Sequence, residues 1–363
     1  MRNGTRRLVR ALMSASVLSL VATAGWSQSL TWLGTLPGGD ITYAHAVTDG
    51  AVVVGWAYNA SRQWRAFRWT ASEGMQNLGT LGGNESWAWG VSANGAVVVG
   101  EAHNDAGQRR AFRWENGVMQ DLGTLPSGTW SGARGVSADG DVVVGVAANA
   151  AGQTRAFRWQ NGVMQDLGTL GGSSSDALGV SADGTVVVGG AVNAAGQRRA
   201  FRWTASGGMQ DLGTLPGYDR SSEAWGVSAD GSVVVGGAIN TAGQWRAVRW
   251  TASGGMEDLN TTYASLLTNG SVLIEARAIS PDGRYIVGEG YNAATRRWEA
   301  FLLDTGFPRR GDVDANGCVD DADLLAVLLA FGGQGYRNED LNWDGVIDDA
   351  DLLIVLFNFG SGC

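Results

Sequence analysis

Residues 131–170 read SGARGVSADGDVVVGVAANAAGQTRAFRWQNGVMQDLGTL, and this stretch decides the fold. It divides into four short runs rich in β-branched and aromatic residues, SGARGVSADG, DVVVGVAANA, TRAFRWQ and GVMQDLGTL. Runs of this length and composition predict strands. The Asp-Gly and Asn-Gly pairs between them supply the positive φ that tight hairpin turns require. The stretch therefore predicts one four-stranded antiparallel sheet.

The same unit recurs between residues 30 and 304. The run VVVG, or a variant of it, ends at six glycines that are mostly 44 or 45 residues apart: Gly55, Gly100, Gly145, Gly189, Gly236 and Gly288. Four strands repeated at this period are typical of a β-propeller blade. We therefore expect an all-β fold, a six-bladed β-propeller of four-stranded repeats. A linear β-solenoid is the alternative.

The last copy of the unit is incomplete. It stops at AFLLDTGF without a fourth strand, whereas LTWLGTL at residues 30–36 stands alone before the first copy. We expect residues 30–36 to pair with the sixth sheet and so close the ring without an open edge. A solenoid would have no reason to begin with an orphan fourth strand.

Several words recur in a fixed order through these copies: AFRWT, MQDLGTL and GVSADG, followed by VVVG. Together they resemble the HAF-type extracellular repeat of secreted bacterial proteins over nearly all of residues 30–304. The resemblance implies an extracellular location and a repeat architecture. It implies no particular activity.

The N-terminus has the layout of a secretory signal peptide. Four Arg precede a short apolar run at residues 11–22, and ATA follows at 22–24. This pattern predicts cleavage after Ala24. A membrane anchor needs about 20 apolar residues, more than this run provides. We expect a protein that is extracellular or at the cell surface, with no membrane span in the mature chain and no nucleic-acid partner.

The acidic charge of the chain is concentrated at its C-terminal end. The whole chain carries −9, yet residues 311–363 hold ten Asp and one Glu against one Arg, a net charge of −10. These residues form two 12-residue loops with oxygen-bearing side chains at positions 1, 3, 5, 9 and 12, Gly at 6, and a backbone carbonyl available at 7. A calcium ion takes six to eight oxygen ligands, and a 12-residue loop of this kind supplies them from these positions. We expect two Ca²⁺ ions, bound by Asp312, Asp314, Asn316, Cys318, Asp320 and Asp323 and by Asp340, Asn342, Asp344, Val346, Asp348 and Asp351.

An apolar run follows each loop, at residues 324–331 and 352–359, and a Gly closes it. These runs predict helices and argue against a disordered acidic tail. Position 12 is Asp rather than the Glu usual in EF-hands, and no entering helix is evident. The duplicated loop and helix resemble a dockerin type I domain, which implies a cohesin-like or other cell-surface protein partner. Positions 10 and 11, Asp321-Ala322 and Asp349-Ala350, depart from the Ser or Thr common in that family, which puts a cohesin in doubt and leaves a cap on the propeller as an alternative.

The expected domains are thus a signal peptide at 1–24, the propeller at 25–306, a linker at 307–311 and the calcium-binding domain at 312–363. Both cysteines, Cys318 and Cys363, lie in the last domain. An exported protein with two Cys favours one disulfide. Free thiols or a zinc site are less favoured, because neither His is nearby.

We expect no catalytic residues in the propeller. Its two histidines lie in different copies, and most carboxylates recur in every copy, which is typical of structural roles. The copies diverge between the fourth strand and the next first strand, at one end of the ring. This connection carries the candidate residues for binding a glycan or a peptide: Tyr43, His45, Trp87, Trp89, Trp130, Arg134, Asp176, Tyr218, Glu223 and Trp225.

Two functions fit these features. The first is a secreted, non-catalytic binding protein whose propeller holds a glycan or protein and whose calcium-dependent tail docks to a partner. The alternative is a carbohydrate-active hydrolase for polysaccharide degradation carried by the same tail, with Glu223 or Asp176 as the acidic residue.

Overall fold

The computed structural model describes residues 30–48, 50–217, 220–306, 311–314, 316–335, 337–342 and 344–363. The expected signal peptide, Tyr218 and most of the expected linker lie outside these residues. The chain divides into two compact units, residues 1–33 and 34–363. In the described part of the chain, no helix is long and apolar enough to cross a membrane.

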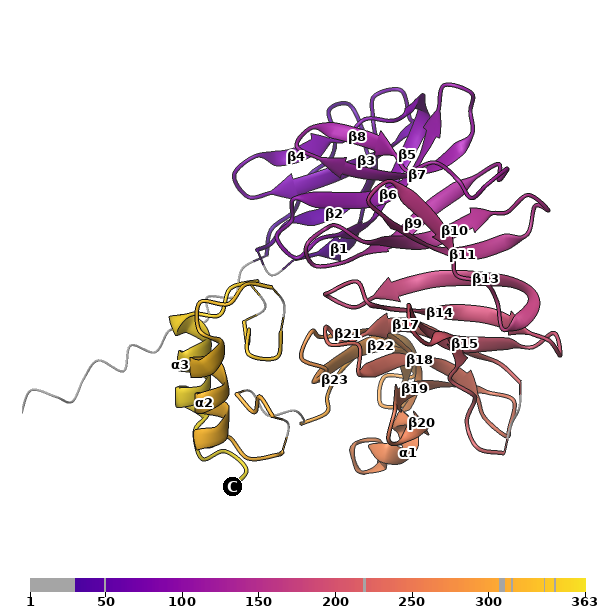
Figure 1. The fold of residues 1–363 in the computed structure, drawn as a ribbon. Helices are drawn as coiled ribbons and strands as arrows, with labels where there is room; N and C mark the ends of the chain where they lie inside the picture. Colours follow the sequence, from indigo (N-terminus) through magenta and orange to yellow (C-terminus); the bar gives the residue numbers. More distant parts are fainter. Residues whose placement is uncertain are drawn as a thin grey trace, which may run out of the picture. The chain divides into compact units, whose positions relative to one another are not determined.

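Residues 42–304 form six antiparallel sheets, each made of strands that are consecutive in the chain (Figure 1). The first three sheets contain β1 Thr42–Val47, β2 Val53–Tyr58, β3 Trp64–Thr70 and β4 Gly74–Asn77; β5 Gly82–Val91, β6 Val97–Asn104, β7 Arg109–Glu115 and β8 Val118–Asp121; and β9 Ser131–Val136, β10 Val143–Ala148, β11 Thr154–Gln160 and β12 Val163–Asp166. The last three contain β13 Gly171–Val180, β14 Val186–Asn193, β15 Arg198–Thr204 and β16 Gly208–Asp211; β17 Ser222–Val227, β18 Val233–Ile239, β19 Trp245–Thr251 and β20 Gly255–Asp258; and β21 Val272–Ile279, β22 Tyr285–Asn292 and β23 Arg297–Asp304.

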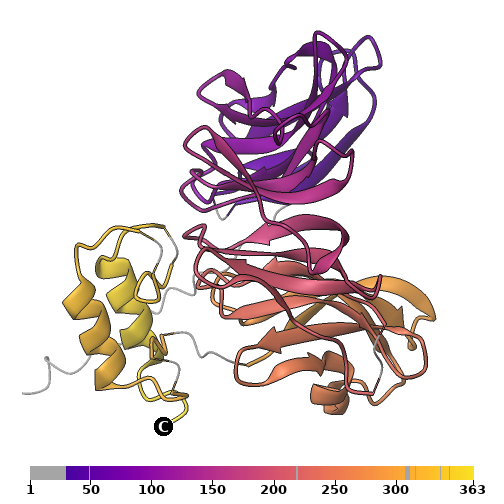
Figure 2. The same ribbon diagram turned by 45° about the vertical axis from the view of Figure 1, so that its right-hand side comes forward.

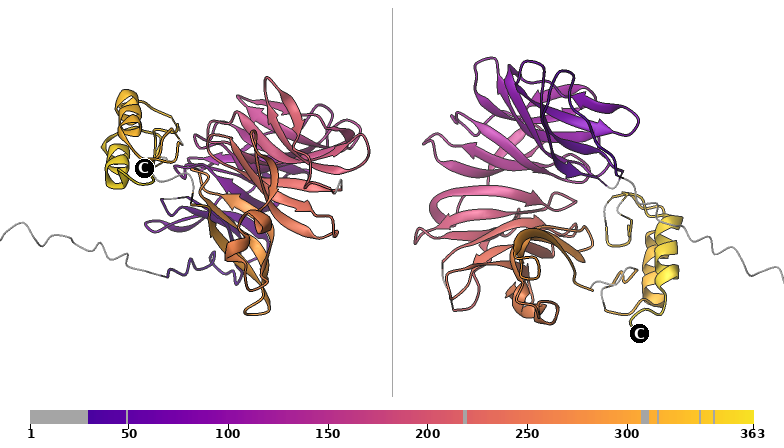
Figure 3. Two further views of the ribbon diagram at one scale, coloured as in Figure 1. Left: turned by 90° about the horizontal axis from the view of Figure 1, so that it is seen from below. Right: turned by 180° about the vertical axis from the view of Figure 1, so that it is seen from behind.

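The sheets follow one another in chain order, as Figures 2 and 3 show from other sides. The first strands of all six line a central channel. Five sheets have the predicted four strands, so the structure confirms the all-β, six-bladed propeller. After β20, the short helix α1 Leu259–Thr262 and the 3₁₀ turn η1 Ala264–Leu266 stand where the other sheets have the LGTL loop.

Apolar side chains of the repeated words fill the space between neighbouring sheets. Between the second and third sheets, Val99 and Ala111 pack against Phe157 and Trp159. The Phe of each RAFRW word is fully buried in the first four sheets. Because every sheet presents a large residue on one side and small residues on the other, the same packing repeats from sheet to sheet.

The two arginines of each RAFRW word join neighbouring sheets by hydrogen bonds to backbone oxygens. The first donates to the next sheet's entry loop, as Arg110 Nη1 does to Thr129 O at 2.7 Å. The second donates to a Gly carbonyl of the next sheet, as Arg113 Nε does to Gly140 O at 3.0 Å. The same bonds join the first sheet to the second, the third to the fourth and the fourth to the fifth, whereas the arginines of the fifth sheet, Arg246 and Arg249, have other partners. We call these the arginine staples.

The sixth sheet is different. Glu299 and Leu302 replace the two arginines, and Leu302 is 68% exposed. The sheet has three strands, and residues 30–36 form no strand, which contradicts the prediction that they complete it. That prediction rested on the similarity of residues 30–36 to the other fourth strands. It did not take into account that Glu299 and Leu302 cannot form the arginine staples. Ala229 N of the fifth sheet donates a hydrogen bond to Pro281 O of the sixth sheet at 2.9 Å. Pro281 has no N–H, so it cannot donate an equivalent bond in turn.

Residues 311–363 form a small module of two loops and two helices, α2 Asp321–Ala330 and α3 Asp349–Asn358. Each helix begins three residues before the apolar run, at a capping box in which two Asp exchange bonds with the backbone, Asp320 with Asp323 and Asp348 with Asp351. A core of Val319, Val327, Ile347 and Val355 joins the two halves. The predicted disulfide between Cys318 and Cys363 is present.

Candidate functional site

A β-bulge interrupts the first strand of every sheet at the same place. The residue left unpaired by the bulge is His45, Trp89, Arg134, Leu178, Trp225 or Arg277. A bulge turns a side chain away from the regular alternation of the strand. The six side chains therefore stand at equivalent positions around the channel. We call them the bulge ring.

Aromatic side chains surround the bulge ring on the first two sheets. The His45 ring lies 4.7 Å from Trp89 and 5.6 Å from Trp56, and Trp56 lies 4.7 Å from Trp89. Tyr43 extends the group outward toward Trp56 and Trp64 and is 52% exposed. The result is a contiguous platform of rings, partly open to solvent.

Packing against these rings also sets the charge of His45. Burial lowers the pKa of His45, the hydrogen bond from its Nδ1 to the Trp89 carbonyl opposes this, and the positive charge of Arg134 lowers the pKa further. The imidazole is therefore neutral at pH 7. It adds a flat, uncharged ring to the platform.

A row of tryptophan, arginine and glutamate continues the site onto the third sheet. The guanidinium of Arg134 lies 4.7 Å above the Trp89 ring, and that of Arg109 lies 4.3 Å above the Trp130 ring. Glu101 is buried between them, with its Oε2 at 3.3 Å from Arg134 Nη1 and 3.7 Å from Arg109 Nη1. One carboxylate thus holds two guanidinium groups flat against aromatic faces.

Carboxylates predominate on the last three sheets. Arg198 Nη2 pairs with Asp176 Oδ2 at 2.6 Å and with Glu223 Oε1 at 2.5 Å. Arg277 lies over the Trp225 ring and pairs with both Glu275 and Glu289. These groups place four carboxylates against two guanidinium groups. This side of the site carries net negative charge.

Glu275 and Glu289 form a carboxyl pair across β21 and β22. Burial raises the pKa of Glu275, and its hydrogen bond with Glu289 raises it further. That same bond lowers the pKa of Glu289. Glu275 therefore holds a proton more tightly than an ordinary carboxyl, while Glu289 is the charged partner.

The structure brings most of the predicted binding residues into three groups. Tyr43, His45, Trp89 and Arg134 are linked by ring and cation–π contacts, with Trp56 beside Tyr43, and Trp130 joins them through Arg109 and Glu101. Asp176 and Glu223 share Arg198, and Trp225 joins Arg277. Trp87 lies against His103, 5.6 Å between ring centres. Tyr218 lies outside the described residues. Sequence reasoning missed residues that complete the site on second strands (Trp56, Glu101 and Glu289), on third strands (Trp64, Arg109 and Arg198) and on the first strand β21 (Glu275 and Arg277).

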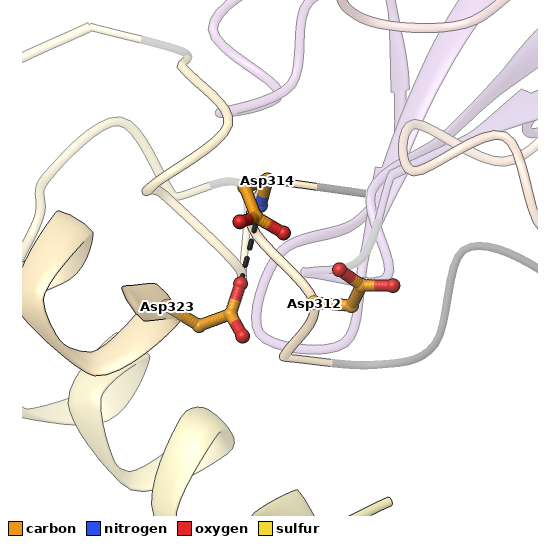
Figure 4. Close-up of side chains that lie close together, drawn as sticks. All are labelled: Asp312, Asp314 and Asp323. Carbon is orange, nitrogen blue, oxygen red and sulfur yellow. Dashed lines mark hydrogen bonds between the residues drawn. The ribbon is translucent and has the colours of Figure 1, made fainter. Parts of the chain in front are cut away.

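A second candidate site lies in the acidic module. Asp312, Asp314 and Asp323 place carboxylate oxygens within 4.8 Å of one another (Figure 4). Asp323 also accepts backbone bonds from Val313 N at 2.6 Å and Asp314 N at 3.2 Å. In the second loop Asp351 makes the equivalent bonds to Leu341 and Asn342. The loops therefore wrap around their position-12 carboxylates.

The burial of these carboxylates fits a cation. Asp323, Asp340 and Asp351 are fully buried, and Asp312 is 6% exposed. Among the described residues, no Arg or His lies within ion-pair distance of any of the four. Burial, together with the charge of Asp323, raises the pKa of Asp312. Buried charges without a partner are costly unless a metal ion neutralises them.

Comparison with known proteins adds the fold alone. No protein-family model matches the chain, and no curated protein matches it, so the HAF and dockerin resemblances gain no support from these comparisons. Among solved structures, a prolyl endopeptidase is similar at a TM-score of 0.51 and 12% identity, over 77% of this chain and 43% of that one. A TolB from Acinetobacter baumannii (TM-score 0.46, 11% identity, 69% of this chain and 60% of that one) and a putative TolB from Agrobacterium tumefaciens (0.47, 15%, 74% and 90%) are more distant. This chain thus spans less than two thirds of the length of the first and second of these proteins.

Proposed function

We propose that this chain is an extracellular, non-catalytic binding protein whose bulge ring and surrounding side chains hold a glycan, and whose acidic module is a calcium-dependent docking tail. The bulge ring carries the proposal. Every sheet has the bulge, but the unpaired side chain differs from one sheet to the next. This variation favours a role in ligand recognition over a purely structural role. Partly exposed rings beside carboxylates and guanidinium groups suit the apolar faces and hydroxyls of a sugar.

Binding to a panel of soluble polysaccharides and peptides tests the propeller part. Tyr43→Ala removes the most exposed ring of the platform and should weaken glycan binding at least about tenfold, or about 1.4 kcal/mol. Tyr285→Ala is the matched control, because Tyr285 is also partly exposed but lies beside Arg284, away from the site. Binding of a peptide but of no polysaccharide would mean that the site recognises peptides instead of glycans. Unaltered glycan binding by Tyr43→Ala would contradict the assignment of the site.

A hydrolase is the second candidate, and Glu275 favours it. A carboxyl with a raised pKa beside a charged one is the arrangement that general acid catalysis uses. Asp176 and Glu223 share the cation Arg198, whereas Glu275, although it pairs with Arg277, also hydrogen-bonds to the carboxyl of Glu289. Release of reducing sugar from a polysaccharide, abolished by Glu275→Gln and retained by Glu223→Gln, would favour the enzyme over the binding protein.

The calcium part of the proposal rests on the buried carboxylates, which accept backbone hydrogen bonds but have no cationic partner among the described residues. The first loop would hold one ion through Asp312, Asp314 and Asp323, and the second loop would hold another through their counterparts. The two ions would offset the negative charge of these carboxylates. The docking role follows the loop-and-helix resemblance. Its calcium dependence is tested below.

A further inference from the structure

The helices of the acidic module expose an apolar surface on each repeat. These residues are Leu325, Leu328 and Leu329 on α2 with Phe331 at its C-terminal end, and Leu353, Leu356 and Phe357 on α3 with Phe359 at its C-terminal end. Within each helix the first three follow an i, i+3, i+4 spacing, so they share one face. Neither helix body, residues 324–331 or 352–359, contains a charged residue. A helix that is apolar on all sides is normally covered on all sides.

The two surfaces match each other residue by residue. Every exposed residue of α2 has its counterpart 28 positions later, and the exposures agree: 80% for Leu329 and 83% for Phe357, 49% for Leu328 and 48% for Leu356. The module therefore carries its own approximate two-fold repeat on the surface it leaves open. Such a repeat suits a two-fold interface, in which each partner offers the same patch to the other.

The area is sufficient for such an interface. If each of the eight side chains contributes roughly 100 Å² of accessible apolar surface, together they offer on the order of 800 Å², the area per partner of a standard protein interface. The net charge of −10 on residues 311–363 also opposes docking on an anionic lipid surface. The carboxylates lie in the loops rather than on the helix bodies, so two copies can bring their apolar faces together without facing like charges.

We propose that the exposed faces of α2 and α3 bind the same faces of a second copy of this chain, so that the protein associates through its tail. The inference rests on the proposed calcium-folded tail, because the ions would fix the loops that position both helices. Bound calcium would also reduce the negative charge that opposes association. Added salt should strengthen the association by screening the remaining like charges, whereas it would weaken binding to a basic partner.

Sedimentation of the full chain tests the proposal, over roughly 1–100 μM, the concentrations at which an interface of this size with micromolar affinity would be populated. With calcium we expect a dimer that dissociates in Leu329→Asp and in Phe357→Asp. Both residues are at least 80% exposed, so neither substitution should affect folding, which the helical circular dichroism of the same samples verifies. Val163→Asp is the control, since Val163 is 66% exposed on the third sheet and should leave the dimer intact.

A chain that binds calcium and folds its tail but stays monomeric throughout this range would overturn the inference and leave the proposed function standing. So would a monomer in which the side chains of Leu329 and Phe357 are protected from hydroxyl-radical labelling, which would mean that the propeller covers them. A dimer lost in both Asp variants but unaffected by chelator would support the surface and remove the calcium part of the proposed function.

Discussion

The propeller and the acidic module are stabilised by different means. Each of the first five sheets buries its apolar side chains against a neighbour, and arginine staples tie four of the five successive sheet pairs together. The module has four fully buried apolar residues, one disulfide and four buried carboxylates. A large repeated core tolerates the loss of one contact, whereas a core this small depends on every covalent or ionic support. The following predictions test that contrast, from the largest expected effect to the smallest.

Removing calcium should destabilise the module and leave the stability of the propeller unchanged. Binding to the folded loops stabilises them by RT ln(1 + [Ca]/Kd), about 4 kcal/mol at a thousandfold excess over Kd. Hydrogen exchange of the full chain measures both regions at once. With chelator, amides of α2 and α3 should lose protection while those of β10 and β11 keep theirs. Asp323→Ala and Asp351→Ala should each remove one site by calorimetry, and helices equally protected with and without calcium would contradict the calcium assignment.

Reducing the disulfide should have a similar but slightly smaller effect on the same module. The bridge spans a sequence separation of 45 residues, and a loop of this length corresponds to roughly 3–4 kcal/mol of stabilisation in the chain-entropy account. Cys318→Ser should therefore lower the module's unfolding temperature and leave that of the propeller unchanged. The double variant Cys318→Ser/Cys363→Ser should behave as the single one does. A shift in the propeller transition would mean that the two regions are coupled.

These two regions were also predictable from the sequence to different degrees. The period of the repeats predicted the sheets, because each hairpin is local and its turn residues are specific. The loops of the module also follow a fixed spacing, from which calcium binding was predicted, and that binding stays a prediction. Residues 30–36 were misjudged, because pairing with the sixth sheet depends on contacts between distant parts of the chain that a repeat pattern does not specify.

About half of the residues of the candidate site could be predicted from the sequence. His45, Trp89, Arg134 and Trp225 were found because they interrupt the repeat before each VSADG turn. Residues such as Glu101 and Arg198 were missed, since only strand register brings them beside the bulge ring. The position after VVVG also varies, as Trp56, Glu101 and Glu289, and that variation was the available signal. The bulge itself leaves no mark in a single sequence.

Without calcium, pH between 5 and 7 should affect the module more than the propeller, in which the lowered pKa of His45 and the raised pKa of Glu275 act in opposite senses. Burial raises the pKa of Asp340 to about 6. The folded module then binds a proton that the unfolded chain, with its carboxyl near the ordinary value, does not bind, so the module loses stability as pH rises from about 4 through 6. In chelator we expect a higher unfolding temperature at pH 5 than at pH 7. Calcium should reverse the order, because it binds the deprotonated carboxylates.

The propeller supplies an internal control for this measurement. The hydrogen bond from Arg284 lowers the pKa of Asp304 to about 2, so Asp304 keeps its charge throughout this range. A propeller transition that moves as much as the module's would contradict the assignment of the effect to Asp340.

The smallest effect should come from removing one arginine staple, and the repeat provides a matched pair for measuring it. Arg65 and Arg246 occupy the same position in the same word, Trp-Arg-Ala, and each bonds the carbonyl of the preceding Trp and the nearby Gln. Arg65 alone also donates to Asn84 O of the next sheet. Arg65→Ala should therefore cost about 1.5–3 kcal/mol more than Arg246→Ala, the range for a hydrogen bond to a charged group. Denaturant unfolding of the two variants gives the difference directly. Equal losses would mean that apolar packing alone joins the sheets, and the contrast between the propeller and the module would then rest on core size and not on the staples.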